Sequence, residues 1–426
     1  MIPVSEAAQI ILNLARSPDA KQEQNIEQIQ LSHALGRVLA QDLVSDPLPA
    51  WPNSAMDGYA LRHVDLEQYQ QLQIVETIAA AGEVIAVTIQ PGQCMRIFTG
   101  GMLPAGADTV VMQEETIRQG DRLELKTQPK LAAYVRQRGS YYDGKQPLIQ
   151  QGSKISATEI GLLAAISRAK VKVHRLPRVA IFSTGNELVE LAANGSSINT
   201  GSKNTALKPG QIIDSNNHAL TALVNQAGAI AQPLGIVSDR EADLKAMIQT
   251  AIAKADLVIS SGGVSVGDYD LVDRVLASLG AMIHVRACAI KPGKPLTVAT
   301  IERADRQPCL YFGLPGNPAS AMVCFWRFIK GAIAKLRGEA EANWQPRFIH
   351  AITTADLNAQ GRRETYLWGK LRIETSAKDK SEWHFDPAPN HISGNLVSLA
   401  GTDALAVLKI NQTYVPAGDR VLVMLV

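Results

Sequence analysis

The pattern of apolar and polar residues divides the chain into segments of different structure. Apolar side chains recur at helical spacing over residues 5–16, which predicts an amphipathic first helix. Between about residues 70 and 150 the apolar runs are short, rich in Val, Ile and Thr, and separated by Gly and Pro, as in a small β-rich domain. Ser156, followed three residues later by Glu159, predicts a capped helix over 156–166. After residue 338 strand-like alternation returns, so we expect a second small β domain at the C-terminus.

Residues 178–337 follow another pattern, in which short apolar runs alternate with longer helical stretches. This alternation indicates the strands and helices of a parallel α/β sheet. Because the central runs are almost continuously apolar, helices are expected to cover both faces of the sheet. The expected strands are residues 178–185, 230–237, 256–263 and 309–316. The expected helices are residues 215–229, 239–255, 270–280 and 319–336.

Length, charge and cysteine usage narrow the class of protein. The 426 residues exceed the size of a single core, about 250–300 residues, so several domains are expected. Lys and Arg number 42 and Asp and Glu number 40, and this net charge of +2 argues against a nucleic-acid coat or a polybasic membrane binder. The 4 cysteines form no C-x-x-C pair, which disfavours a zinc knuckle and favours a reducing compartment. No long apolar run and no signal-peptide pattern occur, so a soluble cytoplasmic protein is expected.

Three expected strands of the α/β region end in polar loops, at residues 183–187, 260–270 and 313–318. In a parallel sheet, ligands bind at the loops that follow the carboxyl ends of the strands. Glycines let backbone N–H groups approach an anion, and the helices that follow add positive potential. The loops therefore predict a phosphate-binding edge, with bare turns as the alternative. The candidate binding residues are Ser183, Thr184, Gly185, Ser261, Gly262, Gly263, Ser265, Gly267, Pro315, Gly316, Asn317 and Pro318.

The segment 290–295 supplies fixed positive charge. Its two lysines, Lys291 and Lys294, stand between prolines, which limits the conformational freedom that is lost when they bind an anion. The alternative is a proline-rich connection with solvated lysines.

Carboxylates beside the predicted anion loop suggest a metal. Asp268 and Asp270 are unfavourable next to a phosphate unless a hard cation such as Mg²⁺ bridges them to phosphate oxygens. Glu187 is a third candidate ligand of this metal. For Asp268 the alternative role is a helix cap, and for Asp270 it is a favourable interaction with the helix dipole.

Two loops outside the α/β region are also rich in functional residue types. Residues 52–60 place small residues around Asp57, and residues 96–101 carry Thr99 from a strand into a Gly pair. Ordinary turn chemistry is the alternative for both loops. The chain has neither a G-x-G-x-x-G fingerprint nor a P-loop, and no serine lies on a nucleophile elbow. A conventional Rossmann dehydrogenase, a P-loop NTPase and a catalytic triad are therefore disfavoured.

Seven segments of the chain resemble one known family. In order they are SAMDGYA, RIFTGGMLPAGADTVVMQEE, IFSTGNELVE, DSNNHALTALV, SSGGVSVGDYDLV, KPGKPL and GLPGNPASA. Together they resemble the MoeA-type molybdopterin molybdenumtransferases, which include the gephyrin E domain. The α/β region alone resembles the MoaB/Mog-type molybdopterin-binding domain, which also occurs in adenylyltransferases and CinA-like proteins.

The resemblance implies an α/β multidomain fold. It comprises a MoaB/Mog-like three-layer α/β domain with a parallel-rich sheet, a β-rich second domain, a linker and dimerisation domain, and a small C-terminal domain like a β-barrel. The implied boundaries are 1–45 with 147–177 for the linker domain, 46–146 for domain II, 178–337 for the α/β domain and 338–426 for domain IV.

The resemblance also implies an activity. Family members insert molybdate into adenylylated molybdopterin with the help of Mg²⁺ and release AMP. They are cytoplasmic homodimers supplied by a molybdopterin adenylyltransferase, with a cleft between the α/β domain of one subunit and domain II of the other. A non-catalytic molybdopterin-binding scaffold and a CinA-like nucleotide hydrolase are the alternative functions.

The family's motifs assign roles to individual positions. The implied catalytic residues are Asp57, Thr99, Glu187, Asp239 and Asp270. The implied substrate contacts include Lys291, Lys294, Pro315 and Pro318, with Arg362 and Arg363 as candidate oxyanion contacts.

The chain departs from the family pattern in two places. Tyr141 stands where an acidic residue is expected, with Asp143 as a candidate replacement, and the polar loop 194–208 is longer than in the family pattern.

Overall fold

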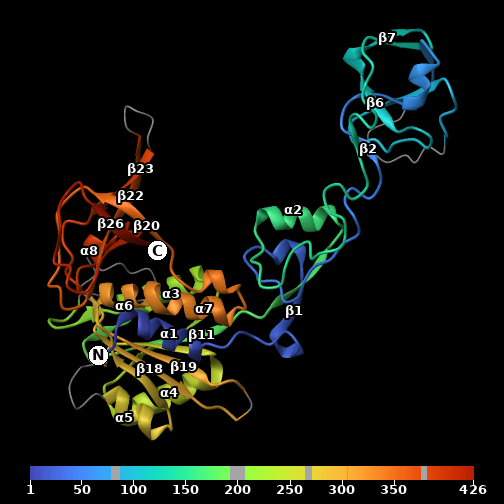
Figure 1. Ribbon diagram of the computed structural model, residues 1–426. Helices are drawn as coiled ribbons and strands as arrows, with labels where there is room; N and C mark the ends of the chain where they lie inside the picture. Colours follow the sequence, from blue (N-terminus) through green and yellow to red (C-terminus); the bar gives the residue numbers. More distant parts are fainter. Residues whose placement is uncertain (78–86, 192–206, 264–270, 305, 376–380) are drawn as a thin grey trace. The chain divides into compact units, whose positions relative to one another are not determined.

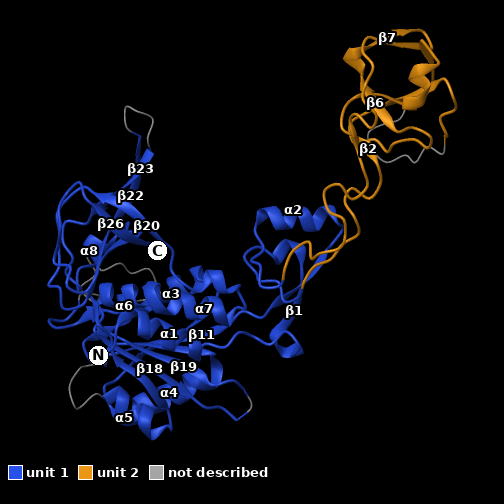
Figure 2. Ribbon diagram, in the orientation of Figure 1, with its two compact units in different colours: residues 1–41, 151–426 blue, residues 42–150 orange. Residues whose placement is uncertain are grey.

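The computed structural model describes residues 1–77, 87–191, 207–263, 271–304, 306–375 and 381–426 (Figure 1). The chain forms two compact units: unit 1 contains residues 1–41 and 151–426, and unit 2 contains residues 42–150 (Figure 2). Among the described helices, none has the length and apolar character that crossing a membrane requires.

A six-stranded sheet is the centre of unit 1. Its strands, in spatial order, are β14 (Ile230–Val237), β11 (Arg178–Thr184), β15 (Leu257–Ser261), β19 (Cys309–Leu314), β18 (Pro295–Ile301) and β16 (Met282–Ala287). The first four strands run parallel, as the sequence predicts, but β18 is antiparallel to β19 and β16 is antiparallel to β18. These two strands were not expected, because no helix separates β16 from β18 along the chain.

Helices cover both faces of this sheet (Figure 1). Successive residues of a strand point to opposite faces, so Val179 and Ile181 of β11 belong to one core and Ala180 and Phe182 to the other. Elements packed in the first core are α1 (Val4–Leu14), α3 (Ser215–Gln226), α6 (Pro318–Cys324) and α7 (Lys330–Leu336). The second core contains α4 (Glu241–Lys254) and α5 (Leu271–Ser278). The predicted three-layer arrangement is therefore present.

The expected long helix at 319–336 is interrupted. A π-helical turn, Phe325–Ile329, separates α6 from α7. The wider turn leaves Arg327 facing the C-terminal domain, where its Nε donates a hydrogen bond of 3.0 Å to the Tyr366 hydroxyl. Helical periodicity alone predicts a helix here but does not reveal one extra residue in a turn.

A smaller part of unit 1 lies between the sheet and unit 2 along the chain. Strand β1 (Ile26–Gln30) pairs antiparallel with β10 (Lys170–His174), although the two are far apart in sequence. Helix α2 (Ala157–Ala165) begins with the predicted capping box. The Ser156 side chain accepts a hydrogen bond from the backbone N–H of Glu159, and the Glu159 side chain accepts one from the backbone N–H of Ser156. The short strands β12 (Leu188–Val189) and β13 (Ile212–Ile213) pair in parallel beside the large sheet.

The C-terminal part of unit 1 is a closed barrel-like sheet. Strands β22, β23, β20, β26 and β24 follow one another around it, and β24 pairs back to β22. Their bounds are β20 (Phe348–Thr353), β22 (Glu364–Thr375), β23 (Ser381–Pro387), β24 (Ala404–Leu408) and β26 (Arg420–Leu425). Short elements complete this part: β21 (Leu357–Asn358), β25 (Tyr414–Val415) and α8 (Leu396–Leu399). Strand β17 (Ile290–Lys291) joins β22 in parallel and so ties the barrel to the α/β part.

Unit 2 is built around a second six-stranded sheet. In spatial order its strands are β6 (Thr109–Met112), β3 (Gly58–Leu61), β5 (Gln93–Ile97), β4 (Gln71–Thr77), β8 (Arg122–Leu125) and β7 (Thr116–Gln119). Strands β2 (Asn53–Ser54) and β9 (Val135–Arg136) form a separate pair. The observed strands agree with the expected β-rich segment, while the exact domain boundaries implied by the resemblance stay a prediction.

Two helical glycines give a matched test of packing. A Cβ atom on Gly331 of α7 would lie 2.1 Å from the Trp344 carbonyl oxygen, whereas one on Gly161 of α2 would meet nothing within 4 Å. We predict that Gly331→Ala lowers the free energy of unfolding by about 1–3 kcal/mol through overpacking. Gly161→Ala should raise it by about 0.5–1 kcal/mol, because alanine loses less backbone entropy in a helix. Calorimetric unfolding of both variants checks this, and shifts in the same direction would contradict the packing.

Candidate functional site

The carboxyl ends of three parallel strands lie at one edge of the large sheet. The register pairs Ser183 of β11 with Ser261 of β15, and Ser261 with Leu314 of β19. The loops that follow these strands must therefore begin side by side, as the sequence predicts. Ser183 and Ser261 are buried, at 1% and 2% exposure, so the loops begin from strand ends that are packed inside the protein.

Close backbone contact holds the first two loops together. Gly262 has φ +89°, and a Cβ atom there would lie 2.3 Å from the carbonyl oxygen of Thr184. Its N–H donates a hydrogen bond of 3.0 Å to the Leu314 carbonyl, so the third loop is fixed to the same residue. Glycine at this position is required both by its conformation and by this close approach.

Asn216, to which the sequence analysis assigned no role, connects two of these loops. Its side-chain amide donates hydrogen bonds of 2.7 Å to the Ser261 hydroxyl and 2.7 Å to the Gly316 carbonyl. The residue lies in the first turn of α3, whose N-cap Asp214 accepts a bond from the Asn217 N–H. The run Asp-Ser-Asn-Asn could have pointed to this role. Only its first residue is needed to cap the helix, so the other polar side chains of the run are left for further hydrogen bonds.

The lysine segment reaches the same edge from the antiparallel strand. Thr297 of β18 pairs with Gly313 of β19, so the start of β18 lies beside the end of β19, and Lys294 directly precedes β18. Among the described residues, the ammonium groups of Lys291 and Lys294 make no hydrogen bond or ion pair. Both charges therefore remain available to a ligand.

The third loop leads directly into α6. Pro318 occupies the first turn of this helix after the N-cap Asn317, whose side chain makes no capping bond. Arg363, a candidate oxyanion contact, instead donates a 3.2 Å hydrogen bond to the Ile290 carbonyl and so supports the strand that carries Lys291. Arg362 is exposed.

Two of the candidate carboxylates lie beside the first loop. Thr184 donates its hydroxyl hydrogen to Asp239, and a Cβ atom on Gly185 would lie 2.7 Å from a carboxylate oxygen of Glu187. Both Asp239 and Glu187 are exposed. The other candidates in this region, Ser265, Gly267, Asp268 and Asp270, lie outside the described residues. Within the described part of the chain, no three His, Cys, Asp or Glu side chains gather closely enough to hold a metal.

Asp57 and Thr99 meet within unit 2. One carboxylate oxygen of Asp57 accepts hydrogen bonds of 2.7 Å from both the backbone N–H and the hydroxyl of Thr99. These two bonds, with a smaller contribution from the positive charge of Arg96, lower the pKa of the Asp57 carboxyl below its ordinary value. Asp57 is exposed, so an ionised carboxylate faces solvent in a fixed orientation.

Arg96 is a second residue that the sequence analysis did not single out. Its guanidinium lies 5.0 Å from the centre of the Tyr59 ring and 5.3 Å from that of Phe98, and it donates to the Gln113 side chain. These contacts fix a positive charge beside Asp57.

Tyr141 and Asp143 are the two candidates for the position where the family pattern has an acidic residue. Tyr141 is 67% exposed, whereas Asp143 forms an ion pair with Lys145.

Family models match three consecutive parts of the chain. Residues 2–167 match the MoeA N-terminal region (domain I and II), and residues 180–335 match a probable molybdopterin binding domain. Residues 350–426 match the MoeA C-terminal region (domain IV).

Similar proteins cover most or all of the chain. A molybdopterin molybdenumtransferase of Nostoc sp. is 46% identical over 430 residues, which cover 100% of this chain and 94% of the relative. One of Haemophilus influenzae is 35% identical over 339 residues, covering 79% of each. The crystal structure of a molybdopterin biosynthesis MoeA protein from Pyrococcus horikosii superposes with a TM-score of 0.78 at 27% identity, covering 100% of this chain and 99% of the other. These matches confirm the resemblance and the fold class: the chain belongs to the MoeA family of molybdopterin molybdenumtransferases.

Proposed function

We propose that this protein completes molybdenum cofactor biosynthesis by inserting molybdate into adenylylated molybdopterin, with release of AMP. The observation that carries the proposal is the meeting of the loops after β11, β15 and β19 with the two available lysines at one sheet edge. Such an edge suits a ligand with several phosphate oxygens, because amides and ammonium groups act there together. Membership of a transferase family supports the same reaction.

In this proposal Lys291, Lys294 and the loop amides bind the phosphates of the substrate's nucleotide tail. Asn216 keeps the second and third loops at a fixed separation, so the amides are preorganised before the substrate arrives. When the phosphoanhydride breaks, negative charge increases on the leaving AMP phosphate, and the lysines stabilise it. Losing one such contact would cost about 2–4 kcal/mol of transition-state stabilisation.

Mg²⁺ is the proposed helper ion. The described carboxylate of Glu187 is a hard oxygen donor on the correct edge, and Asp268 and Asp270 are the further candidates from the neighbouring loop. Mg²⁺ is commonly bound by one or two carboxylates together with phosphate oxygens and water, so these candidates and the substrate's phosphates would suffice to hold it. When bound, the ion would neutralise charge on the anhydride.

Molybdate is the second substrate. It is a tetrahedral dianion, so cationic groups and N–H donors must hold it near the dithiolene of the pterin. Arg362 and Arg96 are the proposed sources of positive charge, and Asp57 with Thr99 orients the reacting groups. Either water or a molybdate oxygen serves as the nucleophile on phosphorus, and the same binding residues support both routes.

The proposed assembly is a cytoplasmic homodimer. The family resemblance gives each site the α/β edge of one subunit and the Asp57 loop of the partner. A molybdopterin adenylyltransferase would supply the substrate, since the reaction consumes an adenylylated pterin.

The two alternative functions make different use of the same fold. A non-catalytic scaffold would bind the pterin nucleotide without releasing AMP. A CinA-like hydrolase would cleave nucleotides that lack a pterin, but the family matches at both ends of the chain favour the MoeA reaction.

The decisive assay incubates the purified protein with adenylylated molybdopterin, molybdate and Mg²⁺, and measures AMP and molybdenum cofactor. We expect equal amounts of both products.

Lys291→Gln combined with Lys294→Gln should slow the reaction by about 10²-fold or more, because two charges at the phosphates are lost. Lys370→Gln combined with Lys409→Gln, which removes two exposed barrel lysines, should leave the rate unchanged. Binding without AMP would indicate the scaffold, and AMP release from nucleotides without a pterin would indicate the hydrolase.

Asp57→Asn separates catalysis from binding. The change keeps the shape of the side chain and removes its charge, so we predict that molybdenum insertion slows by about 10²–10³-fold. Substrate affinity should change by less than about threefold, since the phosphates bind elsewhere. The control is Thr99→Ser, which keeps the hydroxyl donor and should behave like the wild type.

Thr99→Val tests the same pair through pH. Removing the hydroxyl raises the pKa of Asp57 towards its ordinary value, so the loss of activity as the pH falls should begin at a higher pH than in the wild type. For the Asp57→Asn variant of the preceding experiment, equal losses of substrate binding and of molybdenum insertion would contradict the catalytic assignment of Asp57.

A further inference from the structure

A cavity of about 780 Å³ lies at the opposite edge of the large sheet from the candidate site. Arg178 begins β11, Asp256 directly precedes β15 and Pro308 directly precedes β19, and all three line the cavity. Because these strands run parallel, their amino ends lie a full strand length from the loops after their carboxyl ends. The cavity is therefore separate from the edge proposed to bind the pterin substrate. We call it the amino-edge cavity.

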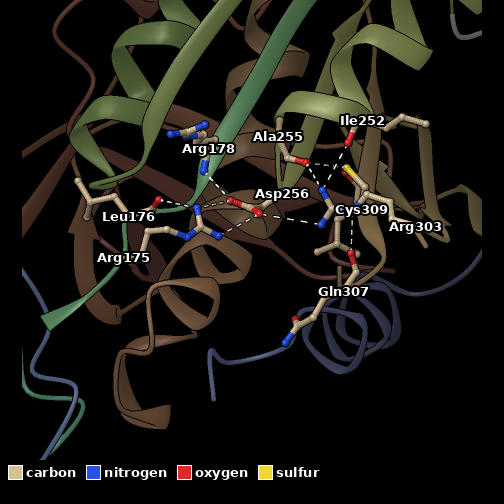
Figure 3. Close-up of polar contacts among 10 residues, drawn as sticks. Arg175, Leu176, Arg178, Ile252, Ala255, Asp256, Arg303, Gln307 and Cys309 are labelled. Carbon is tan, nitrogen blue, oxygen red and sulfur yellow. Dashed lines mark hydrogen bonds and ion pairs between the residues drawn. The ribbon is translucent and has the colours of Figure 1, made fainter. Parts of the chain in front are cut away.

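Asp256 organises the floor of the amino-edge cavity (Figure 3). Its two carboxylate oxygens accept hydrogen bonds of 3.1 and 3.2 Å from the guanidinium of Arg175, and one also accepts a 2.9 Å bond from the Arg178 N–H. The Arg303 guanidinium approaches from the other side, at 3.9 Å. The side chains of Asp256 and Arg303 are 16% and 10% exposed, whereas that of Arg175 is 37% exposed, so the ion pair of Asp256 with Arg303 is shielded from solvent and Arg175 borders it.

Backbone carbonyls fix the second arginine of the floor. Arg303 donates a 2.8 Å hydrogen bond from Nε to the Gln307 carbonyl and another of 2.8 Å from Nη1 to the Ala255 carbonyl. Both floor arginines are thus held in one orientation before any ligand binds. Preorganised guanidinium groups lose little freedom when they contact an anion.

Positive charge in the described lining far exceeds negative charge. The basic side chains are Arg16, Arg175, Arg178, Lys254, Arg303 and Arg306. Asp256 is the single acidic side chain among the described lining residues, and it is already shared by two arginines. The charged ends of Arg16, Arg178 and Lys254 make no hydrogen bond or ion pair with any described residue. These three exposed residues form the rim of the cavity.

We propose that the amino-edge cavity binds a small molecule that carries a diphosphate group. Its volume lies within the range of small-molecule sites, about 300–1,000 Å³. The rim charges repel one another unless an anion lies between them, and diphosphate offers enough oxygens for guanidinium and ammonium donors at once. No aromatic side chain lines the described cavity, so recognition rests on the phosphates and not on stacking of a base.

Titration calorimetry with two probes, pyrophosphate and ADP, tests this proposal. The protein used is the full chain carrying Lys291→Gln and Lys294→Gln, so that binding at the proposed substrate edge does not obscure the second site. We expect saturable binding of one molecule per chain. Adding Arg16→Gln, Arg178→Gln and Lys254→Gln should weaken it by about tenfold or more, because three charged donors are lost. These rim residues are exposed, so unchanged thermal unfolding would confirm that the variant is folded.

The matched control adds Lys370→Gln and Lys409→Gln instead, which removes two exposed charges from the barrel and should leave binding unchanged. Equal affinity for the two probes would assign recognition to the diphosphate alone, and tighter binding of ADP would assign it to a nucleotide; both support the site. If neither pyrophosphate nor ADP binds, the proposal is overturned. Binding that is equally strong in the rim variant would overturn it as well.

Discussion

Parallel pairing of β11, β15 and β19 is the constraint on which the rest of the structure depends. It aligns Ser183, Ser261 and Leu314 at one edge, so three loops from distant parts of the sequence must start together. The contact of Gly262 with Thr184 and the bonds of Asn216 then fix the loops to one another. The antiparallel strand β18 adds the lysines, since its start lies where β19 ends.

The same ladder gives the sheet two basic edges with different chemistry. At the carboxyl edge Lys291 and Lys294 have no described partner, and the neighbouring loops offer backbone amides. At the amino edge Asp256 holds two arginines in place, and further cations surround them. Ammonium groups without a described partner suit a substrate whose charge changes during reaction, whereas guanidinium groups already held by hydrogen bonds suit an anion that is only bound. One sheet thereby supports a reaction site and, in our proposal, a separate anion site.

Sequence patterns predicted the elements whose signals are local. The capping box at Ser156 led directly to α2, and the short apolar runs, three of which end in glycine, led to the four parallel strands. The pairing of β1 with β10 escaped prediction because it joins residues far apart in sequence. In the candidate site, the motif loops were identified from glycines and charges, but the bridging role of Asn216 depends on a distance between loops that no single segment encodes. The cluster around Asp256 was missed for the same reason, since its arginines come from separate connections.

The central proposal, which rests on the family resemblance, is that the lysine edge of one subunit and the Asp57 loop of a partner subunit act as one site. Mixed dimers test it most directly: chains with Asp57→Asn are combined with chains carrying Lys291→Gln and Lys294→Gln, and AMP release is measured. Each heterodimer then contains one site with no substitution, so random mixing should restore about a quarter of wild-type activity. A mixture as inactive as either parent would contradict a site shared between subunits.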